Sequence, residues 1–447
     1  MAEQGKLQRS LKAGDLVLYG LIFMIPIAPI AYYVDQAGGT SGMVALAYLI
    51  GALAMLFTGF SYAAMSKRFP YAGSVYNYVQ KGLEKPDVGF IAGWSMVLDY
   101  ILLPTVTNLV GASYANALIP AIPVWAWTLI FTAIITTVNV LGVKFLSRLS
   151  RVFFVLQAIV IVWLAAAVIY EVATGGASFS ITPFYNADAF DAQTIVSATG
   201  LVVLSFLGFD AISTLAEEVD EPRKTVGRGV IASIALISLL FVAEAFFLGS
   251  IPGVDYADNP DAVALMSNLA LGGPALSLFT QIVLVLSFPL ASGEECMASA
   301  SRILFSMGRD GVLPKQLGYV HPKFHTPVVA VGVIAALTCV LSLCMDLSLL
   351  STLVAFGALF GFLLLNATVV YRLFIKGERT AKSFVTHVVS PVIGFAVCAY
   401  MFFVGLSPAA WAVGCAWLLA GVVILALRTH GFKVPAPQID LDAEVAA

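Results

Sequence analysis

The stretch Ile25–Pro29 (IPIAP) lies about halfway along an apolar segment that is long enough to cross a membrane. A second interruption, Ser205–Asp210 (SFLGFD), lies near the middle of another apolar segment. Irregular backbone at membrane depth is tolerated only where protein buries it or where it lines a cavity. Each motif alone is compatible with a kinked or closely packed helix. Together they indicate two transmembrane helices that are broken at corresponding positions.

The chain around these motifs is almost continuously apolar. Of its 447 residues 60% are hydrophobic and only 11% are charged, whereas soluble domains carry roughly 25% charged residues. A membrane-spanning helix needs about 20 apolar residues, and residues 101–143 and 383–427 exceed this length without Asp, Glu, Lys or Arg. We therefore predict twelve spans, at residues 15–36, 43–66, 88–117, 124–143, 150–170, 191–217, 229–250, 275–305, 326–345, 348–372, 385–405 and 409–428.

The two interrupted spans are the first and the sixth, which cross the membrane in opposite directions. Corresponding breaks five spans apart are typical of an inverted repeat that binds its ligand at the breaks. We expect an all-α integral membrane fold with twelve transmembrane helices, a 5+5 inverted repeat and discontinuous helices 1 and 6. The predicted organisation is an N-terminus (1–14), a core of ten helices (15–372), helices 11 and 12 (373–430) and a tail (431–447).

The basic residues predict the orientation of these spans. All 23 Lys and Arg residues fall in the N-terminus, in five alternate loops with their flanking helix ends, and in the C-terminus. The positive-inside rule assigns that side to the cytoplasm. We expect a multi-pass protein of the cytoplasmic (inner) membrane with both termini in the cytoplasm. The basic start is not followed by a short apolar core with a cleavage site, so no signal peptide is expected.

Several acidic residues remain at membrane depth. Asp99 lies about 17 Å into the third span, counted at 1.5 Å per residue, and Asp210 lies in the break of the sixth. Glu244 lies in the outer half of the seventh span, and Glu294 and Glu295 lie in the eighth. Adjacent helical residues are about 100° apart, so Glu294 and Glu295 cannot both face one cavity.

These acids have no Lys or Arg at a similar depth. Ionisable residues inside a membrane are costly and mark functional sites by default. Their compensating charge must be a proton, a bound cation or the substrate, which indicates an ammonium site with protonation of a carboxylate as the coupling step. Asp210 could equally cap the second half of its own helix. Tyr100, next to Asp99, could be a packing residue or a site residue.

Two acids at the cytoplasmic end of the sixth span, Glu217 and Glu218, lie near Arg223 and Lys224 in the sequence. They form either a gating ion pair or a solvated charge cluster. The motifs of other function classes are missing. There is no GxxxxGK[ST] phosphate loop for ATP-driven transport and no HExxH zinc motif. The net charge of −3 does not favour a nucleic-acid partner, and the five cysteines lie in apolar stretches as small hydrophobic residues.

Longer motifs resemble the amino acid–polyamine–organocation (APC) superfamily. Residues 205–223 (SFLGFDAISTLAEEVDEPR) resemble its sixth-span motif, and residues 306–314 (SMGRDGVLP) with 320–323 (VHPK) are also similar. Residues 68–78 (RFPYAGSVYNY) and 93–100 (GWSMVLDY), with Pro104, look most like bacterial putrescine importers. The similarity runs from about Leu11 to the last spans.

This resemblance implies the LeuT-like fold, alternating access and proton-coupled uptake. It places Asp99 and Tyr100 where the putrescine importers need a tyrosine, Asp210 at the acid after their Gly-Phe, and Glu217 and Glu218 at their inner gate. With the breaks and the buried acids, the expected substrate-binding residues are Pro26, Ile27, Ala28, Asp99, Tyr100, Phe206, Gly208, Asp210 and Glu294. The expected coupling or gating residues are Glu217, Glu218, Glu244, Glu295 and Gln157.

The sequence departs from the family pattern at three places. The first break lacks the Gly-Ser/Thr-Gly of many amino acid carriers, and Ala31 replaces an aspartate of the putrescine importers. Gln157 replaces a lysine through which some relatives couple, whereas Glu244 and the Glu294–Glu295 pair are additional acids.

The sequence therefore predicts a proton-coupled permease that imports an organic cation, in particular a polyamine such as putrescine. The alternatives are an amino acid permease of the same superfamily and a transporter-like sensor or channel. No enzymatic activity, no metal site and no cofactor besides the proton gradient is expected. The expected partners are a small amine or amino acid and the lipid bilayer.

Overall fold

The computed structural model describes residues 11–71, 73–191, 195, 199, 202–251, 261–377 and 379–435. The predictions that concern Lys6 and Arg9, the start of the sixth span and the tail from residue 436 lie outside the described residues, as do the side chains of Lys144 and Arg148. Within this part of the chain the regular structure is helical, apart from one isolated bridge between Leu11 and Val219.

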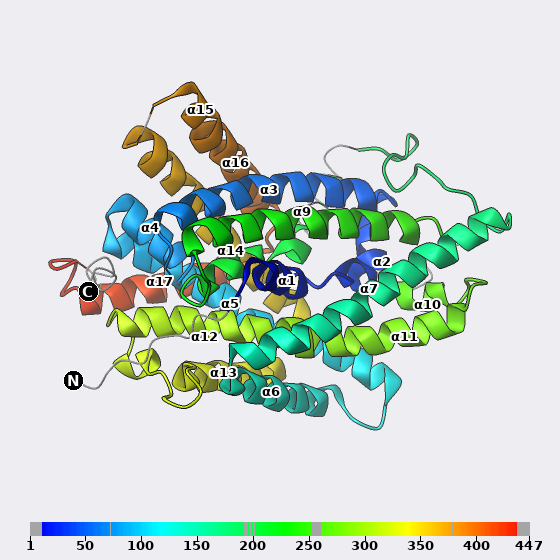
Figure 1. The fold of residues 1–447 in the computed structure, drawn as a ribbon, viewed down its shortest axis with the longest axis horizontal. Coiled ribbons are helices and arrows are strands. Elements are labelled where there is room, and N and C mark those ends of the chain that lie inside the picture. The colour runs from blue at the N-terminus through cyan, green and yellow to red at the C-terminus, as the bar shows by residue number, and fades with distance from the viewer. Residues whose placement is uncertain are drawn as a thin grey trace.

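The elements, labelled as in Figure 1, follow one another along the chain as an array of helices. They are α1 (Ala13–Phe23), α2 (Ala28–Thr40), α3 (Val44–Arg68), α4 (Val75–Leu83), α5 (Pro86–Leu118), α6 (Val124–Leu141), α7 (Val143–Ala173), the 3₁₀ helices η1 (Leu204–Phe206) and η2 (Phe209–Leu215), α9 (Pro222–Leu248), α10 (Ala262–Met266), α11 (Gly273–Leu286), the π-helix η3 (Ser287–Gly293), α12 (Glu294–Arg309), η4 (Lys315–Gly318), α13 (Val328–Cys344), α14 (Leu347–Val369), η5 (Val370–Ile375), α15 (Ala381–Phe384), η6 (Val385–Val389), α16 (Ser390–Val404) and α17 (Pro408–Arg428).

Ten helical segments of the described chain are long and apolar enough to cross a membrane. Two shorter apolar helices, Leu204–Leu215 and Val328–Cys344, lie at the positions of the sixth and ninth predicted spans. In Figure 1 most of the long helices lie side by side along the long axis, and α15 and α16 project from one side of the bundle. These observations confirm the expected all-α membrane fold.

The first span is broken where the sequence predicts it. Helix α1 ends at Phe23 and α2 begins at Ala28, with Ile25 between them in the left-handed region at φ 53°. That region is unfavourable for a β-branched residue and is kept only where the surroundings enforce it. Pro29 in the first turn of α2 suits the restart, because the missing proline N–H would have no helical partner there.

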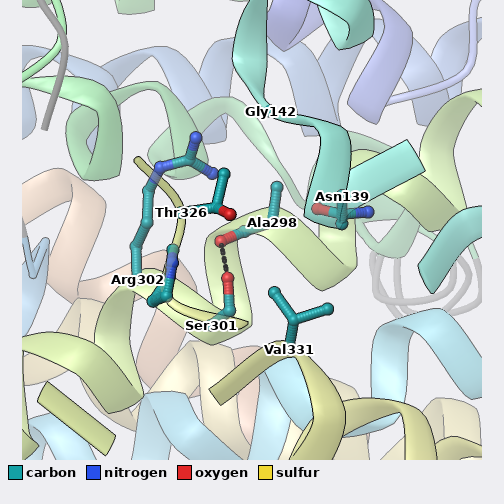
Figure 2. Close-up of a pocket in the computed structure, with 8 residues that line it drawn as sticks. Asn139, Gly142, Ala298, Ser301, Arg302, Thr326 and Val331 are labelled. Carbon is teal, nitrogen blue, oxygen red and sulfur yellow. Dashed lines mark hydrogen bonds between the residues drawn. The ribbon is translucent and has the colours of Figure 1, made fainter. Parts of the chain in front are cut away.

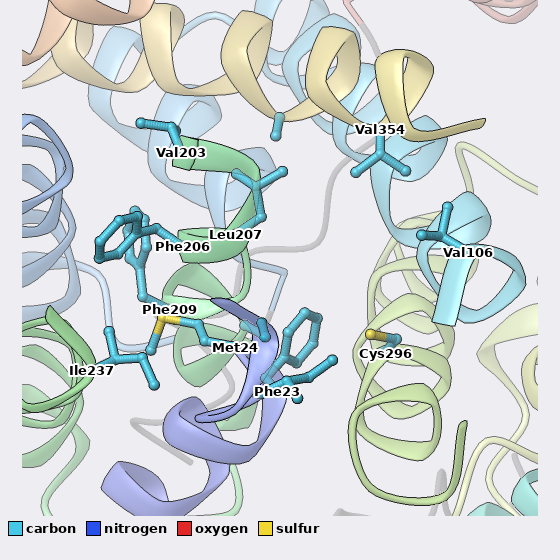
Figure 3. Packing of buried hydrophobic residues seen from close by; sticks show 14 of the residues in the cluster. Phe23, Met24, Val106, Val203, Phe206, Leu207, Phe209, Ile237, Cys296 and Val354 are labelled. Atoms are coloured by element: carbon cyan, nitrogen blue, oxygen red, sulfur yellow. The ribbon is translucent and has the colours of Figure 1, made fainter. Parts of the chain in front are cut away.

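The sixth span is broken at Gly208. The chain is extended at Leu207, turns at Gly208 with φ 121°, and continues as the 3₁₀ helix η2. A Cβ atom at Gly208 would lie 2.0 Å from Cδ1 of Phe23, so only glycine allows this approach. The two breaks therefore touch each other. Figure 3 shows Phe23 and Met24 of the first break among the apolar residues of the sixth span.

The eighth span contains an irregularity that the sequence did not predict. Its middle is the π-helix η3, and such segments are frequent at functional sites. Pro289 of η3 packs where α5 has Gly111, and the Ser292 hydroxyl donates a hydrogen bond to the Phe23 carbonyl at 2.7 Å. By contrast, α5 continues through Pro104 without a break. The π-helix thus holds the end of α1.

The last helix, α17, is fastened to α5 by two indole rings. Trp94 and Trp417 stack with ring centroids 4.5 Å apart and planes 10° apart. Each indole N–H donates to the other residue's backbone carbonyl at 2.8 Å. Gly421 lies under the Trp94 ring, where a Cβ would come within 2.3 Å of it.

Candidate functional site

The breaks bring Asp210 and Tyr100 together. Asp210 lies in the first turn of η2, and its carboxylate accepts a hydrogen bond from the Tyr100 hydroxyl of α5. The backbone N–H of Gly208 donates to the same carboxylate at 3.2 Å. Gly208 and not Asp210 is the N-cap of η2, so the capping alternative is not confirmed, although the Asp210 carboxylate does bond the backbone at the start of this helix. It also presents its charge to α5.

Asp99 lies beside Asp210 in the interior. Asp99 is 2% exposed, and its Oδ1 atom has no hydrogen-bond partner among the described residues. Gly357 of α14 allows the close packing that holds this part of α5, because a Cβ there would lie 2.8 Å from the Asp99 nitrogen. Two neighbouring buried carboxylates repel each other unless a proton or a cation neutralises one of them.

Aromatic rings surround this carboxylate pair. Tyr62 of α3 lies near Asp210 and Asp99, and its ring meets Phe209 edge-on at 5.5 Å. The Phe23 and Tyr100 rings are 6.4 Å apart. Such rings can bind an ammonium group by cation–π attraction once it is desolvated. Sequence reasoning missed Tyr62, which lies in an apolar span with no acidic neighbour.

The predicted residues Pro26, Ile27 and Ala28 lie in the first break and at the start of α2. Phe23, just before the break, packs against Tyr100. Phe206 lies elsewhere. Its ring packs against Phe241 of α9 at 5.2 Å and against Tyr48 of α3 at 6.2 Å. Phe206 therefore belongs to the side of the sixth span that faces α3 and α9.

Glu294 is not brought to the carboxylate pair. Cys296 lies near Asp99 and Asp210, and its sulfur is drawn on the Phe23 side of α12 in Figure 3. Glu294 precedes Cys296 by two residues, which is about 200° around a helix, so its side chain leaves the opposite side of α12. Its backbone carbonyl accepts from Asn139 of α6 at 2.9 Å. The expectation that Glu294 supplies the second anion of the substrate site is not supported by this geometry.

The other predicted coupling residues also lie apart from the carboxylate pair. Glu244 is fully buried near Tyr48, and its two carboxylate oxygens have no partner among the described residues. Gln157 of α7 is fully buried, and its amide has no partner within the described chain. Glu295 lies against α1, where its carbonyl accepts from the Tyr19 hydroxyl at 2.9 Å.

Ion pairs close the end of the bundle at which the Lys- and Arg-bearing loops lie, hereafter the basic end. Glu218 pairs with Arg302 of α12 at 2.5 Å, and both side chains are buried. Glu217 pairs with Arg309 at 3.2 Å. These two arginines differ from Arg223 and Lys224, the basic residues that lie near both acids in the sequence. Lys224 pairs with Glu221 instead. The partners come from α12 because the end of η2 packs against it.

Further contacts join the N-terminal segment and α4 to this closure. The Leu11 N–H donates to the Glu218 carbonyl at 3.1 Å. The Tyr76 hydroxyl of α4 donates to Asp310 at 2.6 Å. Burial raises the pKa of the Asp310 carboxyl above its usual range, although Tyr76 and Arg309 act in the opposite direction. The gating-pair interpretation of Glu217 and Glu218 thus fits better than a solvated cluster.

A small cavity lies between α6, α12 and α13 (Figure 2). Its volume is about 20 Å³, which is room for about one water molecule. The lining residues are Asn139, Gly142, Ala298, Ser301, Arg302, Thr326, Pro327 and Val331. The cavity is too small for an organic substrate. Among the described residues no group of three or more His, Cys, Asp or Glu is placed to hold a metal ion.

Comparison with known families identifies the class of protein to which this arrangement belongs. The amino acid permease family matches residues 21–417, which is most of the chain. The chain therefore belongs to the amino acid permease family of the APC superfamily and is a multi-pass membrane transporter. The resemblance of its motifs to this superfamily is confirmed.

The individual relatives are named for different substrates. The chain is 33% identical over 442 residues to the low-affinity putrescine importer PlaP of Escherichia coli K12, covering 97% of both chains. It is 27% identical over 456 residues to the branched-chain amino acid permease BcaP of Bacillus subtilis 168, covering 95% of this chain and 94% of that one.

A solved structure supports the fold independently. The crystal structure of MhsT in complex with L-phenylalanine superimposes with a TM-score of 0.67 over 90% of this chain and 100% of that one. The sequence identity is 11%, so the likeness concerns the fold alone. The expected LeuT-like architecture with discontinuous helices 1 and 6 is confirmed.

Proposed function

We propose that the protein is a proton-coupled secondary transporter of the inner membrane that imports an organic cation, specifically a polyamine such as putrescine. The observation that carries the proposal is the pair of neighbouring buried carboxylates, Asp99 and Asp210, at the meeting point of the two breaks. Among the described residues neither carboxylate forms an ion pair with a Lys, Arg or His side chain. An ammonium group supplies the charge that this pair lacks.

The proposed amine site uses the chemistry of each neighbour. An ammonium group between Asp99 and Asp210 donates hydrogen bonds to both carboxylates, and such charge-assisted bonds are strong. The Tyr100 hydroxyl keeps the Asp210 carboxylate oriented. The methylene chain of a diamine packs against Phe23 and Tyr62. A proton retained on one carboxyl of the pair leaves a single negative charge, and the bound ammonium group then makes the site neutral.

Release of the amine requires the basic end to open. The Glu218–Arg302 and Glu217–Arg309 pairs close this end in the present conformation. In the proposed cycle these pairs separate when η2 moves away from α12. With the positive-inside orientation, the basic end and both termini face the cytoplasm, so opening there completes import.

The relatives agree with this choice of substrate class. PlaP is named as a putrescine importer, and its similarity extends over 97% of both chains. BcaP is named as a branched-chain amino acid permease and has lower identity over a similar length. The first break also lacks the Gly-Ser/Thr-Gly of many amino acid carriers.

The test is uptake into proteoliposomes with labelled putrescine and an imposed proton gradient. Asp99→Asn and Asp210→Asn should each abolish uptake, because each removes a charge that the ammonium needs. Asp87→Asn at the start of the same helix is the matched control and should keep it. Full uptake in both central variants would rule out the organic-cation site, and dependence on sodium would rule out proton coupling.

The similarity to BcaP makes an amino acid permease the second candidate. A zwitterion needs a positive pole for its carboxylate, and the N-terminal ends of α2 and η2 at the breaks offer one. A thermal-shift panel of amines and branched-chain amino acids on the purified protein separates the two. Stabilisation by diamines supports the first candidate, and stabilisation by leucine or isoleucine alone supports the second.

A further inference from the structure

Glu294 is the first residue of α12 and is fully buried. Neither of its carboxylate oxygens has a hydrogen-bond partner within the described chain. An isolated ionised carboxylate in an apolar interior is so costly that the group is neutralised instead. This side chain is therefore held in its neutral, protonated form or opposite a cation.

Among the groups around Glu294, a proton is the positive charge that neutralises its carboxyl group. The helices α6 and α13 and the π-helix η3 contain no Asp, Glu, Lys, Arg or His. On α12 itself the neighbours are Glu295, another acid, and Arg302, which pairs with Glu218. The titratable side chains on α13 and α5 are Cys339, Cys344, Asp87, Asp99, Tyr100 and Tyr114. Within the described chain no group of three or more His, Cys, Asp or Glu side chains is placed to hold a metal ion at Glu294.

On α12 the cavity of Figure 2 is lined by Ala298, Ser301 and Arg302, and Ala298 lies on the same helical face as Glu294, four residues away. Ala298 is one helical turn from Glu294, about 6 Å along the axis. Asn139 also lines the cavity, and its side-chain amide donates to the Glu294 carbonyl. The cavity has room for about one water molecule, with Ser301 and Arg302 as polar lining.

The other end of the cavity lies at the basic end of the bundle. Its lining includes Gly142, which is partly exposed between α6 and α7, and Thr326, which precedes α13. The Thr326 hydroxyl donates to the Val140 carbonyl at 3.1 Å, so this segment closes on the end of α6. A water in the cavity is thus placed between the buried carboxyl and the loops of the basic end.

We infer that Glu294 is a proton-binding site separate from the amine site, and that it exchanges its proton with the basic end through the cavity lined by Asn139 and Arg302. Asn139 is a positioning residue, because it fixes the backbone from which the carboxyl projects. The inference rests on the proposed function only in assuming that the proton drives uptake of an amine. The site itself is defined by the burial of Glu294, its missing partners and the adjacent cavity.

The protonation of Glu294 is tested without any substrate. Infrared difference spectra of the purified protein against Glu294→Gln at neutral pH should show the loss of a protonated carboxylic acid band. The loss of an ionised carboxylate band instead would overturn the site. Because no amine is added, this result does not depend on whether the protein transports polyamines.

Access through the cavity is tested by filling it. Ala298→Val should leave the carboxylic acid band in place and slow its isotope shift on transfer to heavy water. Ala336→Val, the same change at an exposed position of α13, is the matched control and should leave the shift rate unchanged. An unchanged rate in Ala298→Val would show that the proton takes another route and would overturn the role of the cavity.

The use of the proton is tested in proteoliposomes with the membrane potential held at zero. Glu294→Gln should lose accumulation driven by a pH gradient and reach only equal concentrations on both sides. Exchange of labelled for unlabelled putrescine and the thermal shift by putrescine should persist. Glu171→Gln, the same change at a buried carboxyl near the end of α7, should keep gradient-driven accumulation.

The outcomes of the transport test separate the two proposals. Gradient-driven accumulation in Glu294→Gln would overturn its coupling role. Equal loss in Glu171→Gln would also overturn it, because the effect would then be common to buried carboxyl groups. A wild-type protein that neither binds nor exchanges any amine would refute the proposed function, while the infrared result would still decide the proton site.

Discussion

The buried acids at the centre of the bundle and those at its basic end differ in their partners. Within the described part of the chain the Asp210 carboxylate accepts hydrogen bonds from neutral donors, among them the Tyr100 hydroxyl and the Gly208 N–H. Glu218 and Glu217 instead pair with arginines of α12. A carboxylate without a counter-charge can bind a cationic ligand, whereas an ion pair between two helices holds them together. The difference indicates that the centre is built to bind and the basic end to close.

A single helix connects these two regions. Helix α12 begins at mid-depth with Glu294 and Glu295 and carries Arg302 and Arg309 toward the basic end. The first turn of α12 contacts α1 through Tyr19, and Arg302 in its second half holds Glu218 in the segment after η2. Substitutions in both regions test this difference, and their expected effects decrease from the most buried ion pair to the most exposed one.

The largest effect is expected from Glu218→Gln. This change leaves the buried guanidinium of Arg302 without its counter-charge, and breaking such a pair typically costs about 3–5 kcal/mol of unfolding free energy. Denaturant unfolding in detergent micelles measures it. The double variant Glu218→Met with Arg302→Met removes both charges and should recover most of the loss. Wild-type stability in Glu218→Gln would contradict a closure that depends on this pair.

A smaller loss is expected from Gly208→Ala at the centre. The new methyl group would meet the Phe23 ring, and φ 121° is unfavourable for alanine, a strain of about 1–3 kcal/mol. Transport should fall as well, since the two breaks would be pushed apart. The control is Gly332→Ala in α13, where no atom lies within 4 Å of the added carbon. Thermal unfolding of the two variants decides whether the break itself needs glycine.

Glu217→Gln tests the second ion pair of the basic end. Its side chain is partly exposed, and Arg309 also lies 4.0 Å from Asp310 and over the Phe305 ring. Because these contacts remain, we expect a loss of about 1 kcal/mol or less. The same unfolding assay applies. A loss as large as that of Glu218→Gln would show that burial does not set the difference between the two pairs.

The smallest effect is expected from Glu84→Gln in the loop before α5. Hydrogen bonds and charge attraction from Lys376 and Arg372 lower the pKa of the Glu84 carboxyl. A lowered pKa contributes stability above the usual glutamate pKa, and that contribution disappears as the pH falls through the folded-state value. The melting temperatures of the wild type and Glu84→Gln should differ slightly at neutral pH and converge in acid. Divergence toward acid would contradict the sign.

The sequence was sufficient for the features that depend on position along a span. The IPIAP and SFLGFD motifs identify the two breaks, because proline and glycine have backbone consequences wherever they lie. The charge pattern likewise places the acids at the centre. Proline alone is not decisive, since α5 continues through Pro104, and Pro289 marks a π-helix that the sequence did not reveal.

The sequence was insufficient for features that depend on the rotation of one helix against another. Glu294 and Cys296 are two residues apart, yet only Cys296 lies near Asp99. Arg302 and Arg309 are far from Glu217 and Glu218 in the sequence, so the true ion pairs arise from tertiary packing. Helix α12 is amphipathic, but its neighbour α5, which carries Asp99, is apolar on nearly all sides and gives no amphipathic signal for its rotation.

The reciprocal bonds between Trp94 and Trp417 link the outermost helix to the centre of the bundle. Helix α5 carries Asp99 and Tyr100, and the stacked indoles make α17 move with it as one rigid unit. The far side of α17 is open to its surroundings, where Leu419 is 64% exposed. A fluorophore or spin label at position 419 would therefore report from the rim of the molecule on displacements of α5, without touching the carboxylates.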